Sequence, residues 1–225
     1  MNDGIQVNVT CGQLRSWGRQ ALAGNWSLAV MGALLFSFLN FLPVLVINLV
    51  FDSDGLEWVI NLYGILVSGP LTLGFTTFMI AIFRRRQTSP SEVFYGFESF
   101  GKSLGLFLVM NFFILLWSLL FIIPGIIAAY RYAMSFYILA DNPGFGIMET
   151  IKESKRIMYG NKGKLFIMEL SFIGWAILAA ITAGIGFLWL MPYMVASTVA
   201  FYEIANGNLR VGHREASIEH HQEER

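Results

Sequence analysis

The stretch Gly101–Asn142, GKSLGLFLVMNFFILLWSLLFIIPGIIAAYRYAMSFYILADN, decides the fold. Leu104–Ile123 carries no formal charge, and as a helix its roughly twenty residues extend about 30 Å, the thickness of the hydrocarbon core of a bilayer. Because lipid offers the backbone no hydrogen-bond partner, such a run must be helical. Proline removes a donor and glycine tolerates unusual dihedrals, so Pro124-Gly125 is predicted to fold the chain back into a second membrane helix.

The return helix is expected to be short. Ile126–Ala140 contains only about fifteen residues, or roughly 22 Å, which falls short of a full crossing. We therefore expect either that the Pro124-Gly125 break lies below the lipid surface or that the helix continues through it with a kink.

The composition agrees with a membrane protein. Of 225 residues, 56% are hydrophobic and 13% are charged, whereas about a quarter of a soluble globule is charged. The formal net charge is zero, which gives no support to binding of nucleic acid. The single cysteine, Cys11, excludes an internal disulfide and is interpreted as a small buried or interfacial residue.

The hydrophobic pattern predicts an all-α protein with six transmembrane helices arranged in three hairpins, at about 26–83, 104–140 and 165–205. Within the last hairpin, Leu165–Ala183 and a helix from Ile185 are the two spans. Residues 1–25 form an N-terminal segment, residues 26–205 the membrane domain, and residues 206–225 a polar tail. Gly69-Pro70 is predicted to interrupt the second span, and Gly64, Gly69 and Gly74 indicate close helix contact.

Three amphipathic segments precede the hairpins and are predicted to lie on the membrane surface. The first begins with a Thr10-x-x-Gln13 capping box and has Leu14 and Trp17 on one face. The second, at about 89–100, begins with Ser89-Pro90-Ser91-Glu92 and presents Val93, Phe94, Phe97 and Phe100. The third, at about 145–160, has an apolar stripe of Ile147, Met148, Ile151 and Met158.

The basic residues fix the expected orientation. In the six-span arrangement all basic residues outside the spans fall on one side of the membrane. The charged loop residues on the other side are the acidic Asp52, Asp54 and Glu57. The positive-inside rule therefore places both termini in the cytoplasm. These basic residues are Arg15, Arg19, Arg84, Arg85, Arg86, Lys102, Lys152, Lys155, Arg156, Lys162, Lys164, Arg210 and Arg214.

The three units also look like an internal repeat. Each surface segment ends near a glycine, at Gly24, Gly101 and Gly163, and opens a span. The second span of each hairpin carries a proline before its cytoplasmic end, and those ends are Arg84, Asp141 and Asn206. We interpret this as three parallel copies of one unit about an axis along the membrane normal.

Several runs resemble a known family. They include FIIPGIIAAYRYAMSFYILADNP (Phe121–Pro143), IKESKRIMYGNKGKLF (Ile151–Phe166) and LWLMPYMVASTVAFYE (Leu188–Glu203). The sequence is similar to bacterial integral membrane proteins catalogued as domain of unknown function 975, over nearly the whole chain before Asn206. The resemblance implies a bacterial cytoplasmic membrane location and supplies no catalytic residues.

Two groups of residues are candidate sites. Arg131 is a basic residue inside a span, with Asn111 and Asn61 as possible polar neighbours in a translocation path. Alternatively Arg131 snorkels to outer phosphates or pairs with Asp52, Asp54 or Glu57, and the asparagines join helices. Glu169 and Glu203 are expected to be satisfied by nearby lysines and water.

The second group of candidate residues could bind anionic lipid, or could reflect ordinary positive-inside bias. Its members are Lys152, Lys155, Arg156, Lys162 and Lys164.

These observations favour a non-enzymatic membrane protein that assists a membrane process by binding lipid or a partner membrane protein. The alternative is a small-molecule or peptide transporter with a cavity framed by the proline-broken helices. The sequence contains no zinc-protease, nucleophile-elbow or phosphate-binding motif, so no catalytic or cofactor-binding residue is assigned. A metal site is not expected either, because His213, His220 and His221 all lie in the tail.

Overall fold

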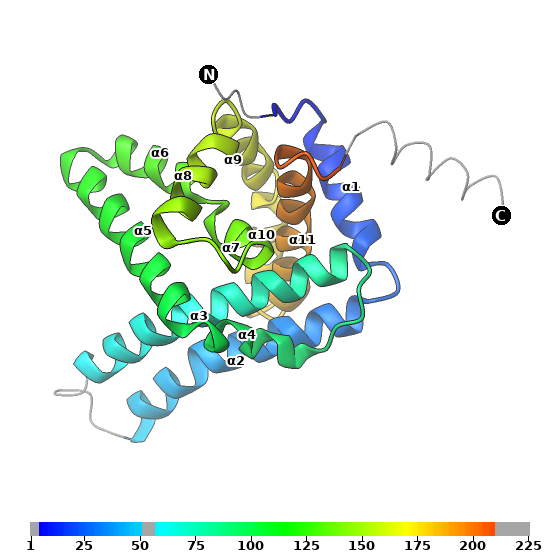
Figure 1. Ribbon diagram of the computed structural model, residues 1–225. Coiled ribbons are helices and arrows are strands. Elements are labelled where there is room, and N and C mark those ends of the chain that lie inside the picture. Colours follow the sequence, from blue (N-terminus) through cyan, green and yellow to red (C-terminus); the bar gives the residue numbers. More distant parts are fainter. Residues whose placement is uncertain (1–4, 51–56, 210–225) are drawn as a thin grey trace.

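The computed structural model describes residues 5–50 and 57–209, and within these residues every regular element is a helix. Six stretches are long and apolar enough to cross a membrane (Figure 1). The predicted all-α class and the number of membrane-length helices are therefore confirmed, and the chain has the character of a multi-pass membrane protein. Asp52, Asp54 and the tail from residue 210 lie outside the described residues. The six stretches are Trp26–Ile47, Glu57–Phe83, Phe100–Leu120, Ile122–Asp141, Lys162–Ile181 and Phe187–Ala205.

The first helix, α1 (Cys11–Leu22), begins with the predicted capping box. The Gln13 amide donates to Thr10 Oγ1 at 3.2 Å, and the Thr10 amide donates to Gln13 Oε1 at 2.9 Å, so two amides at the helix start are satisfied together. The apolar face of α1, including Leu14 and Trp17, is buried and packs on α11 (Phe187–Ala205). This face contacts protein, and the location of α1 at a membrane surface stays a prediction.

Helices α2 (Trp26–Val50) and α3 (Glu57–Phe83) pack against each other, and α3 runs without a break through Pro70. The predicted interruption at Gly69-Pro70 is therefore wrong. A membrane helix can contain proline without breaking. Here the chain at Gly96 approaches so closely that a Cβ atom on that residue would lie 1.9 Å from the Pro70 carbonyl oxygen.

The segment predicted as one surface helix at 89–100 is a short 3₁₀ turn, η1 (Pro90–Phe94), followed by α4 (Tyr95–Glu98), and both pack on α3. The predicted serine capping box does not form, because the Ser89 hydroxyl contacts the Ser91 hydroxyl at 2.5 Å instead of a helix amide. Gly74 allows the contact with α3, since a Cβ there would lie 1.9 Å from the Val93 carbonyl oxygen. Close packing is thus confirmed at Gly74, and at Gly69 against Ser103, whereas Gly64 meets open space.

The second hairpin turns at Phe121 rather than at Pro124-Gly125. Helix α5 (Phe100–Leu120) ends there, and α6 (Ile122–Tyr132) begins with Pro124 in its first turn. Our placement of the break was wrong because amides in the first turn of a helix have no intrahelical acceptor, so a proline in that turn loses nothing. Phe121 supplies the extended residue between the two helices, with φ of −161° and ψ of 150°.

The return span is longer than predicted. Helix α6 leads through Ala133 and Met134 into α7 (Ser135–Asp141), so the stretch Ile122–Asp141 has 20 residues, enough for a full crossing. The expectation of a helix too short to span, starting at Ile126, is therefore also wrong. The helical path is interrupted at Ala133 and Met134, between α6 and α7, and not at the predicted proline.

The third connector, α8 (Ile147–Ile157), only partly follows the predicted stripe. Ile151 is buried, but Met148 is 59% exposed. The buried face also includes Thr150 and Ser154, whose small hydroxyl side chains donate to backbone carbonyl oxygens, Ser154 to that of Arg131. Small polar residues can take buried positions when their hydroxyl groups are satisfied locally.

The third hairpin contains α9 (Lys162–Leu170), α10 (Ile173–Ile181) and α11. The predicted span Leu165–Ala183 is interrupted at Ser171 and Phe172, whereas α11 is continuous through Pro192. The C-terminal halves of α3 and α11 are buried and, with α7, form the centre of the molecule (Figure 1). Large apolar side chains on α5 and α10 are exposed, as lipid-facing residues would be.

Candidate functional site

The first predicted site stays a prediction. Arg131, Asn111 and Asn61 lie on α6, α5 and α3, and all three are exposed. The Asn111 amide group donates to the Phe107 carbonyl oxygen of its own helix at 2.8 Å. None of the three lines a cavity described below, and among the described residues no ion pair involves Arg131.

The second predicted site is divided between paired and unpaired cations. Arg156 forms an ion pair with Glu153 at 2.5 Å, and that hydrogen bonding raises the pKa of Arg156 above its ordinary value. Lys155 Nζ lies 5.5 Å from the centre of the Tyr132 ring and 5.9 Å from that of Phe113, distances typical of cation–π contacts. Three of the five cations remain without an ion pair or ring contact in residues 57–209, and these are Lys152, Lys162 and Lys164.

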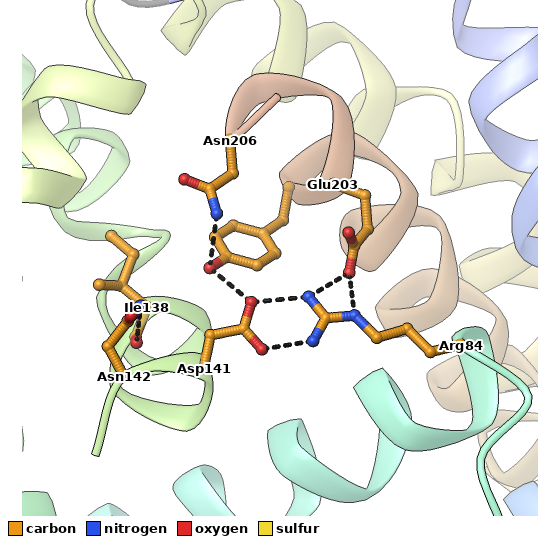
Figure 2. Close-up of polar contacts among 7 residues, drawn as sticks. Arg84, Ile138, Asp141, Asn142, Glu203 and Asn206 are labelled. Atoms are coloured by element: carbon orange, nitrogen blue, oxygen red, sulfur yellow. Dashed lines mark hydrogen bonds and ion pairs between the residues drawn. The ribbon is translucent and has the colours of Figure 1, made fainter. Parts of the chain in front are cut away.

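An ionic junction joins the ends of α3, α7 and α11. Arg84, just after α3, donates from Nη1 and Nη2 to the two oxygens of Asp141 at 2.6 Å each, and from Nε to Glu203 Oε1 at 2.7 Å. Figure 2 shows the guanidinium group held between the two carboxylates. The junction is largely shielded, because the side chains of Arg84, Asp141 and Glu203 are 20%, 14% and 5% exposed. One arginine therefore joins the ends of three helices that lie far apart in the sequence.

Further polar groups complete the junction. The Tyr202 hydroxyl donates to Asp141 Oδ2 at 3.0 Å, and Asn206 Nδ2 donates to the oxygen of the same hydroxyl at 3.3 Å. Burial of the Arg84 guanidinium opposes its charge, but its hydrogen bonds to Asp141 and the negative charges of Glu203 and Asp141 outweigh burial. The pKa of Arg84 is raised above its ordinary value, so Arg84 keeps its positive charge at any physiological pH.

A broad polar hollow of about 710 Å³ opens over this junction. Its wall combines the ion-paired groups with Arg85, which is exposed, and with amide side chains. Because Arg85 brings the local charge close to balance, the hollow suits polar or zwitterionic groups rather than a strongly charged one. It is lined by Phe83, Arg84, Arg85, Asp141, Asn142, Glu203, Asn206, Asn208 and Leu209.

Sequence reasoning identified Arg84 and Asp141 as ends of second spans but did not connect them. Glu203 was expected to be satisfied by lysines and water, whereas Arg84 satisfies it. The proposed repeat could have predicted this junction. It places a charged residue near the end of each second span, and these residues would meet if the three spans converged. The repeat itself stays a prediction.

Two smaller cavities lie among the spans. One of about 370 Å³ is apolar and includes Trp26, Trp175 and Trp189 in its wall. The other, of about 260 Å³, contains the carboxylate of Glu169, which accepts a hydrogen bond from the Tyr130 hydroxyl at 2.5 Å. Among the described residues no group of three or more His, Cys, Asp or Glu side chains is arranged to hold a metal ion.

Comparison with known proteins gives one result. A family model described as protein of unknown function (DUF975) matches residues 10–130 and 119–208. No curated protein and no solved structure matches the chain.

Proposed function

The chain belongs to the family described as protein of unknown function (DUF975), and from that premise we propose that it is a non-enzymatic membrane protein that binds anionic lipid. We place it in the bacterial cytoplasmic membrane with both termini in the cytoplasm, because the basic residues gather at one end of the six spans. In this proposal the ionic junction is a structural clamp. Lipid binding then lies at a different place, the corner between α8 and α9.

The observation that carries the proposal is the composition of this corner, residues 159–166. Lys162 and Lys164 stand in the first turn of α9, at the start of the membrane-length stretch Lys162–Ile181. Tyr159 and Phe166 beside them are 67% and 46% exposed. Aromatic rings at the level of the head groups with lysines at the same height are the arrangement that holds a protein to anionic lipid.

The number of unpaired lysines sets the affinity that this proposal expects. Each cation near an anionic surface contributes about 1 kcal/mol, so Lys152, Lys162 and Lys164 together account for about 3 kcal/mol. This corresponds to roughly a hundredfold in affinity. Lys155 and Arg156 are expected to add little, because ring contacts and Glu153 already engage them.

The test is native mass spectrometry of the purified full chain titrated with phosphatidylglycerol and, separately, with phosphatidylcholine. In the variant Lys152→Gln/Lys162→Gln/Lys164→Gln the affinity for phosphatidylglycerol should fall roughly a hundredfold, with no change for phosphatidylcholine. The matched control is Glu153→Gln/Arg156→Gln, which removes one ion pair of α8 at constant net charge. If the triple variant binds phosphatidylglycerol as tightly as the unchanged protein, the proposal fails.

The alternative function, a transporter with a cavity framed by proline-broken helices, has less support. Pro70 and Pro192 lie inside continuous helices, and Pro124 lies in the first turn of α6. Arg131 is exposed and lines none of the cavities described above. A binding role therefore fits the geometry better.

A further inference from the structure

The 260 Å³ cavity lies inside the bundle, between α6–α7, α9 and α11, and each of these helices is part of a membrane-length stretch. Glu169 stands seven residues after the start of α9, which is about 10 Å along the helix axis. A carboxylate at such a depth is costly unless a positive charge or several hydrogen bonds satisfy it. The cavity is lined by Ala133, Tyr137, Leu165, Met168, Glu169, Phe172, Met194, Val195 and Thr198.

The carboxylate of Glu169 is only half satisfied. Its Oε2 accepts the hydrogen bond from Tyr130, whose ring is held edge-on against Phe166 at 5.8 Å. Within the part of the chain that the structure describes, Oε1 has no hydrogen-bond partner. One oxygen is thus anchored and the other is available to a ligand.

No positive side chain fills this need. The lining contains neither lysine nor arginine. Arg15 of α1 approaches the same region, but its guanidinium group donates to the Ser171 carbonyl oxygen at 3.2 Å and lies 5.8 Å from the centre of the Phe172 ring. Among the described residues no ion pair joins Arg15 to Glu169. The missing positive charge can therefore come from a ligand.

The remaining lining defines the kind of cation. The Thr198 hydroxyl donates to the Met194 carbonyl oxygen at 3.0 Å and also forms a hydrogen bond with the side chain of Tyr137, so both hydroxyl groups are engaged within the protein. Tyr137 and Phe172 contribute aromatic rings, which attract cations, while Met168 and Met194 contribute polarizable thioethers. Mg²⁺ and Ca²⁺ take six or more oxygen ligands, and the side chains lining this cavity have too few. We propose that the Glu169 cavity binds a small organic ammonium ion.

The size and surroundings of the cavity fit this ligand. Its volume of about 260 Å³ is below the range of about 300–1,000 Å³ for pockets that take drug-sized molecules, so the ion has few heavy atoms. The Tyr137 ring lies 5.6 Å from that of Tyr202, whose hydroxyl donates to Asp141 at the polar hollow. The cavity and the hollow are therefore linked through this pair of aromatic rings.

The experiment uses the purified full chain in detergent and two probes, ethanolammonium chloride and tetramethylammonium chloride, with sodium chloride at equal ionic strength as the reference. Isothermal titration calorimetry gives the dissociation constant, and the unfolding temperature gives an independent reading of binding. The variant is Glu169→Gln, which keeps the size of the side chain and an oxygen for Tyr130 to bond. The control is Glu98→Gln, because Glu98 is an exposed carboxylate of α4 far along the chain from the cavity.

We expect saturable binding of at least one ammonium ion to the unchanged protein and to Glu98→Gln, and at least tenfold weaker binding to Glu169→Gln. The unfolding temperature of the unchanged protein should rise with that ion and not with sodium chloride. Absence of saturable binding by both probes, or equal affinity in Glu169→Gln, overturns the inference. The lysines of the lipid proposal play no part in this cavity, so either proposal can fail without the other.

Discussion

Replacing Arg84 by methionine is the sharpest perturbation of the fold, because it leaves Asp141 and Glu203 facing each other without a cation. Arg84→Met removes three charge-assisted hydrogen bonds of 2.6–2.7 Å from carboxylates that are 14% and 5% exposed. Removing one partner of a buried ion pair costs about 3–5 kcal/mol. Since the Arg84 side chain is itself 20% exposed, water relieves part of this, and we expect a loss of about 3 kcal/mol.

The assay is equilibrium unfolding in mixed detergent micelles, followed by tryptophan fluorescence. Arg86→Met is the matched control, because Arg86 is exposed and a surface substitution changes the free energy of unfolding by at most about 0.5 kcal/mol. The variant Arg84→Met/Asp141→Asn/Glu203→Gln removes all three charges and should recover at least about 2 kcal/mol relative to Arg84→Met, because no unpaired charge remains. The reasoning is refuted if Arg84→Met unfolds like Arg86→Met, or if the triple variant is no more stable than the single one.

Two further predictions test the packing of the connecting segments. Gly96→Ala would place a Cβ 1.9 Å from the Pro70 carbonyl oxygen and should lower the free energy of unfolding by at least about 2 kcal/mol. Its control, Gly101→Ala, meets open space in α5 and should be neutral or stabilising, and equal stabilities would contradict the close contact of α4 with α3. Asn161→Ala removes the buried amide group that accepts from the Val7 amide at 2.9 Å and donates to the Ile5 carbonyl oxygen at 2.8 Å. Limited proteolysis should then cut the N-terminal segment faster, and an unchanged rate would show that this tether is unimportant.

The features that depend on neighbours in sequence could be predicted. The α1 cap needs only Thr10 and Gln13, three residues apart, and each membrane-length helix is a continuous apolar run. Helix breaks were predicted less well, because proline was treated as the break when its missing donor is harmless in a first turn. Pro124 shows this, since the chain turns three residues earlier at Phe121.

The candidate sites depended on contacts between distant residues. Arg84 is 57 residues from Asp141 and 119 from Glu203, and no local pattern states that these side chains meet. The lysines were found from their clustering, but their separation into engaged and unpaired members required the positions of Glu153 and Phe113. Glu169 was noticed as an acidic residue within a span, whereas its cavity is lined by residues of α7, α9 and α11 that come together only in the fold.

The lipid proposal rests on the claim that the α8–α9 corner faces the cytoplasm while the start of α3 faces the opposite side. The most direct measurement is labelling of single cysteines with a membrane-impermeant maleimide, in a Cys11→Ser background, at Lys162→Cys and Glu57→Cys. In intact cells the reagent should label Glu57→Cys alone, and Lys162→Cys should react only after the membrane is opened. Labelling of Lys162→Cys in intact cells, or protection of Glu57→Cys until the cells are opened, would contradict the account.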